Sequence, residues 1–175
     1  MKIAIISDMH DHVAILQKSI DLFKHADAVL CCGDLCSPFI VNILAEGFTK
    51  DIHIVFGNND GDTYRITKNA AAYPHVHLYG ELFKMEIAGK QVAMNHYPEI
   101  AKELAASQHF DVVCYGHDHQ FYNGNVGKTL LINPGTLMGY NPITKSFVDV
   151  TFGMYDMEKN QFEVIKVQES SSAEM

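Results

Sequence analysis

The stretch Ile-Ala-Ile-Ile-Ser-Asp-Met-His, residues 3–10, decides the fold that we expect for this chain. A continuous run of apolar or small residues is typical of a strand buried on both faces in the middle of a layered α/β domain. Asp8 and His10 follow the run directly, at the end of the strand where open α/β sheets place their ligands. The stretch therefore predicts a central strand that delivers two metal-capable side chains to a site.

The same pattern recurs along the chain. Further buried strands are expected at residues 27–32, 52–56 and 111–115, and a hairpin at residues 82–94. They lead into Gly33-Asp34, Gly57-Asn58-Asn59-Asp60, Gly116-His117-Asp118-His119 and, after the hairpin, Asn95-His96. Because strand after strand ends in possible ligands, chance is a poor explanation, and we interpret these segments as parts of one site.

Helical patterns separate these strands. Helices are expected at residues 11–25, at residues 37–47, within residues 62–79 ahead of a short edge strand at 76–78, and from residue 98 to before residue 110. Strands at residues 129–132, 147–155 and 162–167 complete the chain, and the last two have the alternation of antiparallel strands with one face in the core. This order of elements indicates an α/β fold.

The composition is that of one compact domain. Of 175 residues, 47% are hydrophobic and 19% are charged, which is enough apolar material for a substantial core. Neither an internal repeat nor a linker divides the sequence. We expect a single domain over residues 1–169 and a disordered tail over residues 170–175.

The charge and the apolar segments exclude several classes of partner. A net charge of −8 disfavours a groove that follows a polyanionic backbone, so no stable nucleic-acid partner is expected. No apolar stretch is long enough to span a bilayer and the first residues do not resemble a signal peptide, which predicts no membrane partner and a cytoplasmic location. Cys31, Cys32 and Cys114 lie in apolar runs and no CxxC pair occurs, which favours buried thiols over a thiolate metal site.

The residues at the strand ends have the chemistry of metal ligands. Together they are Asp8, His10, Asp34, Asn58, His96, His117 and His119. Three oxygen ligands and four imidazoles suit two neighbouring metal ions when one carboxylate bridges them and water completes each coordination shell.

This set of motifs, in this order, resembles the calcineurin-like metallophosphoesterases. The resemblance extends over residues 1–136 and consists of Asp-x-His, Gly-Asp, Gly-Asn-x-Asp, a single His and Gly-His-x-His. The short chain and the segment Ile132-Asn133-Pro134-Gly135 are similar to the small bacterial and archaeal phosphodiesterase branch. The resemblance implies an α/β fold with four layers, an α/β/β/α sandwich in which helices flank two facing mixed sheets.

The resemblance also implies how the site is used. Asp8, His10 and His119 would hold one divalent metal ion, Asn58, His96 and His117 the other, and Asp34 would bridge them. Manganese is the ion that we expect, although the same ligands suit iron, nickel, cobalt or zinc. The implied reaction is hydrolysis of a small phosphodiester substrate by in-line attack of a metal-bridging hydroxide.

One position departs from the family pattern. Asn59 occupies the place where larger members carry a histidine that helps to protonate the leaving oxygen, and where the small branch commonly carries a cysteine. An amide cannot transfer a proton in this way, so Asn59 puts leaving-group assistance in doubt. His12, at the start of the first expected helix, is the alternative acid. The candidate catalytic residues are therefore Asp34, Asn58, Asn59 and His12.

Two other functions are compatible with the pattern. Some proteins of this fold have lost metal ligands and serve as non-catalytic scaffolds in membrane-trafficking coats, but the full ligand set argues against that function here. A nuclease is the other alternative, which the acidic charge and the lack of a capping domain disfavour. The sequence leaves open the physiological substrate and the oligomeric state, with a homodimer as one option.

Overall fold

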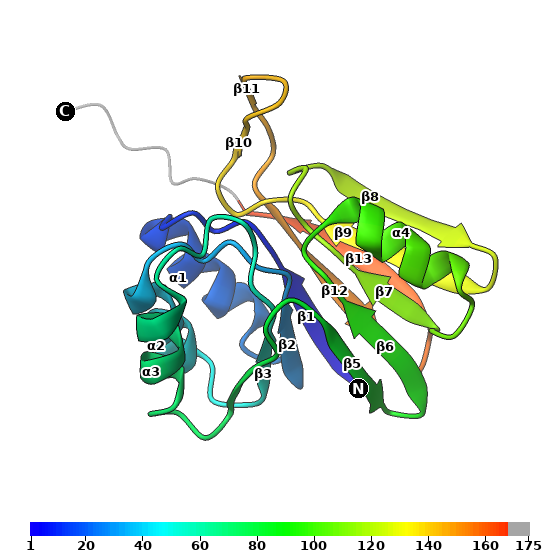
Figure 1. Cartoon of the computed structure of the whole chain (residues 1–175), viewed down its shortest axis with the longest axis horizontal. Coiled ribbons are helices and arrows are strands. Elements are labelled where there is room, and N and C mark those ends of the chain that lie inside the picture. The colour runs from blue at the N-terminus through cyan, green and yellow to red at the C-terminus, as the bar shows by residue number, and fades with distance from the viewer. Residues whose placement is uncertain (168–175) are drawn as a thin grey trace.

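A computed structural model describes residues 1–167, in which two large β-sheets face each other (Figure 1). The first sheet has the strand order β13-β12-β1-β2-β3-β4 and the second has the order β5-β6-β7-β9-β8. Strands of the first sheet are β1 (Lys2–Ile6), β2 (Ala28–Cys31), β3 (Ile52–Ile54), β4 (Val76–Leu78), β12 (Thr151–Asp156) and β13 (Gln161–Lys166). Strands of the second are β5 (Phe83–Ile87), β6 (Lys90–Met94), β7 (Val112–Cys114), β8 (Phe121–Val126) and β9 (Thr129–Pro134).

Four helices connect and cover these strands: α1 (Val13–Phe23), α2 (Pro38–Gly47), α3 (Thr63–Ala70) and α4 (Pro98–Ala106). Pro38 and Pro98 lie in the first turns of α2 and α4, where a missing N–H costs no hydrogen bond. None of the helices within residues 1–167 is long and apolar enough to cross a membrane.

The alternation of side chains along β1 shows how the layers are stacked. Ala4 and Ile6 pack with apolar residues of α1 and α2 on one face of the first sheet. Ile3 and Ile5 point to the opposite face and pack with residues of β5, β6, β7 and β9 between the sheets. A third cluster joins α4 to the outer face of the second sheet. This order of layers agrees with the expected α/β/β/α sandwich, and the α/β fold class is confirmed.

The pairing of the strands determines where their polar ends meet. β1, β2, β3 and β4 run parallel to one another, and so do β6, β7 and β9. The carboxyl ends of β1, β2 and β3 therefore lie on one edge of the first sheet, and those of β6 and β7 on one edge of the second. Backbone hydrogen bonds from Asp8 N to the Gly33 carbonyl and from Gly116 N to the His96 carbonyl, both 3.1 Å, join neighbouring strand ends.

The strand expected at residues 147–155 is present as β12, but it begins at Thr151 and not at Phe147. Residues up to Phe147 belong instead to a small hairpin of β10 (Tyr140–Asn141) and β11 (Ser146–Phe147), which projects from the sheets in Figure 1. Val148 N then donates to the Gly139 carbonyl (3.1 Å), and the chain joins the sheet only at Thr151. The tertiary contact with residue 139 interrupts a run that its own sequence would favour as one strand.

The sequence also gave no indication of β8. Its exposed segment Phe-Tyr-Asn-Gly-Asn-Val contains residues of low strand propensity, and it is a strand because it pairs along its whole length with β9. The other expected elements are present, with ends that differ by a few residues. Cys31, Cys32 and Cys114 are buried free thiols, as expected. The expected tail at residues 170–175 lies outside the described residues.

Candidate metal centre

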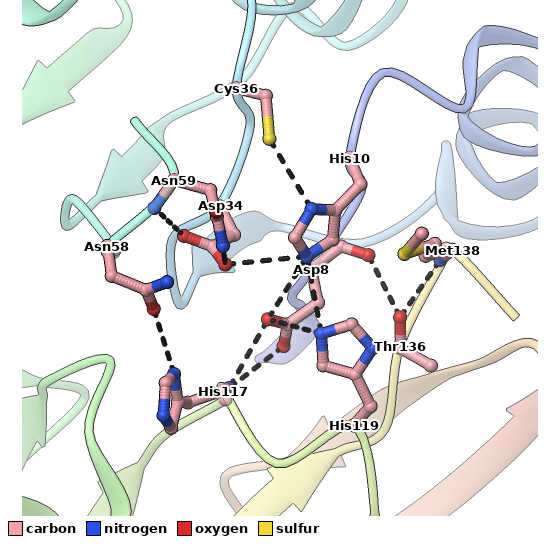
Figure 2. Close-up of polar contacts among 12 residues, drawn as sticks. Asp8, His10, Asp34, Cys36, Asn58, Asn59, His117, His119, Thr136 and Met138 are labelled. Carbon is pink, nitrogen blue, oxygen red and sulfur yellow. Dashed lines mark hydrogen bonds and ion pairs between the residues drawn. The ribbon is translucent and has the colours of Figure 1, made fainter. Parts of the chain in front are cut away.

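The loops that follow five strands bring the expected ligands together in one place (Figure 2). Five of these ligands have left-handed backbone conformations: Asp8 (φ 54°), His10 (φ 42°), Asp34 (φ 58°), His117 (φ 74°) and His119 (φ 55°). Residues other than glycine rarely adopt this conformation, and clusters of it are characteristic of functional sites. The backbone is thus bent sharply at each strand end, and the bends turn the side chains towards a common point.

Asp8, His10 and His119 form one group. His10 Nε2 lies 3.2 Å from His119 Nε2, and Asp8 Oδ1 lies 3.3 Å from the latter atom and 3.8 Å from the former. One ligand atom from each residue falls within 4.8 Å of the others, which is the spacing of a site able to hold a metal ion. The three residues come from the ends of β1 and β7, in sheets that face each other.

Asn58, His96 and His117 form a second group. Asn58 Oδ1 lies 3.1 Å from His96 Nε2 and 2.8 Å from His117 Nδ1, and the two imidazole nitrogens are 3.3 Å apart. An amide oxygen and two imidazoles therefore converge from the ends of β3, β6 and β7. The ring of Tyr97 packs beside this group, with its centroid 5.2 Å from that of His96 and 5.3 Å from that of His117.

Asp34 lies between the two groups. Its Oδ2 atom is 3.4 Å from His10 Nε2 and 3.5 Å from His96 Nε2, so one oxygen faces a histidine of each group. The side chain is almost completely buried. Asp8 is not confined to the first group, because its carboxylate also falls within 4.8 Å of ligand atoms of Asp34 and His96.

Three of the four histidines use their second nitrogen to fix the ring. His96 Nδ1 donates to the Cys32 carbonyl (2.7 Å) and His119 Nδ1 donates to the Tyr140 carbonyl (2.5 Å). His10 Nδ1 lies 3.4 Å from the sulfur of Cys36. Such contacts orient metal-binding imidazoles and determine which nitrogen faces the ion. In these three residues Nε2 faces the centre, whereas His117 turns Nδ1 towards it.

The donor set fits divalent cations. The ion-pair partners of the buried Asp8 and Asp34 carboxylates are imidazoles. Burial disfavours the ionised form of Asp8, but hydrogen bonds with His10 and His119 outweigh it and hold the pKa of Asp8 well below its usual range. Burial likewise opposes the charged form of His119, but the contact with Asp8 raises the pKa of His119. The centre thus stabilises positive charge beside the carboxylate of Asp8, and a bound metal ion would supply that positive charge more strongly.

Asp60 is a site residue whose role the sequence did not reveal. Its buried carboxylate accepts hydrogen bonds from the backbone N–H groups of Asp34 (3.0 Å), Cys36 (2.8 Å) and Gly57 (2.8 Å). It thereby joins the loop after β2 to the loop after β3. The only sign of this role in the sequence is the position of Asp60 at the end of the Gly-Asn-x-Asp motif. The Cys32 and Tyr140 carbonyls, which orient His96 and His119, are backbone groups and have no sequence signature.

The two candidate acid positions have defined surroundings. Asn59 is exposed and hydrogen-bonds to the carboxylate of Asp34. His12 is the N-cap of α1, where its Nδ1 atom accepts the N–H of Ile15 (3.3 Å), so this nitrogen is engaged with the helix.

Comparisons with known proteins agree with the geometry. A model of the calcineurin-like phosphoesterase superfamily domain matches residues 1–160. Over 172 residues the chain is 29% identical to phosphodiesterase MJ0936 of Methanocaldococcus jannaschii, and this alignment covers 96% of the chain and 100% of that protein.

Solved structures share the architecture. An archaeal phosphodiesterase matches with a TM-score of 0.86 and 29% identity, covering 95% of this chain and 100% of the other. YfcE, a phosphoesterase of E. coli, matches with a TM-score of 0.66 and 18% identity over 96% and 100% of the two chains. Vps29 of Entamoeba histolytica, in complex with Zn²⁺, matches with a TM-score of 0.68 and 18% identity over 95% and 98%. The similarities to YfcE and Vps29 are similarities of fold alone.

Proposed function

The chain belongs to the calcineurin-like phosphoesterase superfamily, a metal-dependent family, and we propose that it is a phosphodiesterase that uses two divalent metal ions. The phosphoesterase class follows from the family. The preference for diesters is supported by the 29% identical relative from Methanocaldococcus jannaschii, which is a phosphodiesterase. The proposal includes the small phosphodiester substrate and the cytoplasmic location expected from the sequence.

The observation that carries the proposal is the position of Asp34. Its Oδ2 atom lies 3.4 Å from His10 Nε2 and 3.5 Å from His96 Nε2, and each of these histidines belongs to a different ligand group. A carboxylate oxygen with equal access to both groups is suited to be shared between two cations. We therefore assign one ion to Asp8, His10 and His119, the other to Asn58, His96 and His117, and the shared position to Asp34.

The residues of the protein hold the metal-binding side chains in place and provide a local electrostatic field. Cys32, Tyr140 and Cys36 fix the imidazole rings through their second nitrogens, so the inward nitrogens are held in place before a ligand binds. Two bound cations would lower the pKa of a coordinated water towards neutrality and would neutralise charge on the phosphoryl oxygens of the substrate. An acidic protein of net charge −8 can then attract an anionic substrate to this one place.

The types of ligand do not determine which metal ion binds. Oxygen and imidazole ligands suit manganese, which we propose, and also iron, nickel, cobalt and zinc. Loading of the purified, chelator-treated protein with each ion in turn would identify the ion that supports turnover.

The test of the proposal is hydrolysis of a panel of aryl phosphodiesters and phosphomonoesters by chelator-treated protein, with and without added Mn²⁺. We expect turnover of diesters that depends on the added ion, and about two bound ions per chain by elemental analysis of protein purified without chelator. A protein that binds no metal and hydrolyses none of the esters would contradict the proposal and favour the scaffold function.

A further inference from the structure

We propose that Asn59 is a positioning residue, whose side-chain amide holds the Asp34 carboxylate in the orientation that places one oxygen between the two ligand groups. This inference rests on the proposed two-metal function. It concerns the position at which the sequence departs from the family pattern, and it gives this asparagine a role other than proton transfer.

Asn59 holds both oxygens of the carboxylate. Its backbone N–H donates to Asp34 Oδ1 (2.8 Å) and its side-chain Nδ2 donates to Asp34 Oδ2 (2.8 Å), as Figure 2 shows. Oδ2 is the same atom that lies 3.4 Å from His10 Nε2 and 3.5 Å from His96 Nε2. The side-chain hydrogen bond therefore acts on the oxygen that we assign to the shared position.

In Asp34, only the rotation of the carboxylate about its terminal torsion still has to be restricted. Its backbone is already held, because its N–H donates to Asp60 Oδ2 (3.0 Å) in a left-handed conformation with φ 58°. The terminal torsion of an aspartate is broad and intrinsically soft. With only the backbone donor of Asn59 on Oδ1, the plane of the carboxylate could turn about that contact. The second donor, on Oδ2, fixes the plane.

The chemistry of the amide suits this role. An amide N–H donates to the carboxylate without adding a positive charge beside the cations, whereas the ammonium group of a lysine would compete with them. The Asn59 side chain is exposed, so it contributes little to the core. Its replacement should alter the metal centre without unfolding the protein.

The test uses Asn59→Ala, which removes the side-chain donor, and Asn59→His, which can restore an N–H near the same position. Asn125→Ala is the matched control, because Asn125 is also an exposed asparagine but lies on β8. Mn²⁺ affinity of the chelator-treated proteins is measured by equilibrium dialysis, together with the melting temperature of the metal-free proteins and with kcat and KM for an aryl phosphodiester.

Loss of an outer contact to a metal ligand typically weakens binding about 10–100-fold, and we expect a loss of this size in Asn59→Ala. We expect kcat to fall with little change in KM, an unchanged metal-free melting temperature, substantial recovery in Asn59→His, and wild-type behaviour in Asn125→Ala.

Wild-type Mn²⁺ affinity in Asn59→Ala would overturn the inference and leave the proposed function intact. A rise in KM alone would indicate a contact with substrate, and a fall in the metal-free melting temperature would indicate a structural role; either outcome overturns the positioning role. If the wild-type protein itself binds no Mn²⁺, both the inference and the proposed function fail.

Discussion

At the scale of single residues, several structural constraints meet at Asp34. It is 1% exposed, it faces a histidine of each ligand group, and its own backbone is held in a left-handed conformation. Loops from β2 and β3 meet on it through Asp60 and Asn59. A change at this residue should therefore affect both proposed metal positions at once.

We predict that Asp34→Asn abolishes turnover and lowers the metal content below that of His10→Ala, His96→Ala, His117→Ala or His119→Ala. The amide keeps the size of the side chain but removes the negative charge that two cations would share. Elemental analysis and a diesterase assay measure the two effects. An Asp34→Asn protein with about two ions per chain and near-normal activity would refute the bridging assignment.

The residues beside the centre lead to a prediction about the leaving group. General acid catalysis is typically worth about 10²–10⁴-fold, and an amide at position 59 cannot provide it. We therefore predict that the rate depends steeply on the pKa of the leaving group, so that activated aryl diesters are good substrates and alkyl monoesters are poor ones. A series of phosphodiesters with graded leaving groups measures this dependence.

His12 needs a control that preserves its structural contact. Because its Nδ1 atom caps α1, His12→Asn is the suitable variant: asparagine is a good N-cap and cannot transfer the proton. The no-acid interpretation expects the same steep dependence in wild type and in His12→Asn. A shallow dependence in wild type that becomes steep in His12→Asn would instead make His12 the acid.

At the scale of elements, the loop between β3 and α3 acts as a clamp on the loop after β2. Asp60 binds three backbone N–H groups, Asn59 binds the Asp34 carboxylate, and Asn58 supplies an oxygen to the second ligand group. The close approach of these two loops requires a residue without a side chain at position 57. A Cβ atom there would overlap Asp34 Oδ1 and lie 2.8 Å from His96 Cε1.

We predict that Gly57→Ala displaces Asp34 and loses most of its bound metal and activity, at a cost in folding stability of about 1–3 kcal/mol, the usual cost of overpacking. Gly61→Ala is the matched control, because it lies in the same loop and an added Cβ there has nothing within 4 Å. Metal content, activity and chemical denaturation are measured for both variants. Equal metal content, activity and stability of the two variants would show that the loops after β2 and β3 can move apart at residue 57 without harm to the site.

At the scale of the whole molecule, His53 links the two sheets. His53 on β3 is buried, contacts the ring of Phe83 on β5 with centroids 5.3 Å apart, and stacks on His77 of β4 at 5.1 Å. Its Nδ1 atom lies 2.9 Å from the hydroxyl of Tyr79. Burial, reinforced by the neighbouring His77, lowers the pKa of His53 from its ordinary value of 6.5.

This shift makes the free energy of unfolding depend on pH. Because the pKa of His53 is lower in the folded state, the unfolded state binds more protons between the two pKa values. The contribution of His53 is thus fully present above about pH 6.5, the unfolded value, and is lost as the pH falls towards the folded pKa.

We predict that the wild-type protein loses stability from pH 7 to pH 5 more steeply than His53→Gln does. The exposed His25 supplies the control variant His25→Gln, which should keep the wild-type slope. Urea denaturation of the metal-free proteins at each pH measures the slopes. Parallel curves for wild type and His53→Gln would contradict the assignment to His53.

The sequence by itself determined the family, the order of most elements and the set of polar residues at the strand ends. This was achievable because a buried strand leaves a local apolar run, and because parallel strands must deliver their carboxyl ends to a common edge. Asp8 and His119, which are far apart in the sequence, could therefore be expected in one place. The distance of 3.3 Å between Asp8 Oδ1 and His119 Nε2 agrees with that expectation.

Only the tertiary structure decided the features that depend on a partner far along the chain. The exposed strand β8 exists through its pairing with β9, and the contact of Val148 with Gly139 separates β11 from β12. The orientation of His96 depends on a carbonyl 64 residues away, and the role of Asp60 depends on backbone N–H groups in another loop. A backbone donor or acceptor is present at almost every residue and leaves no mark in the sequence, so the packing of the chain has to select which ones the site uses.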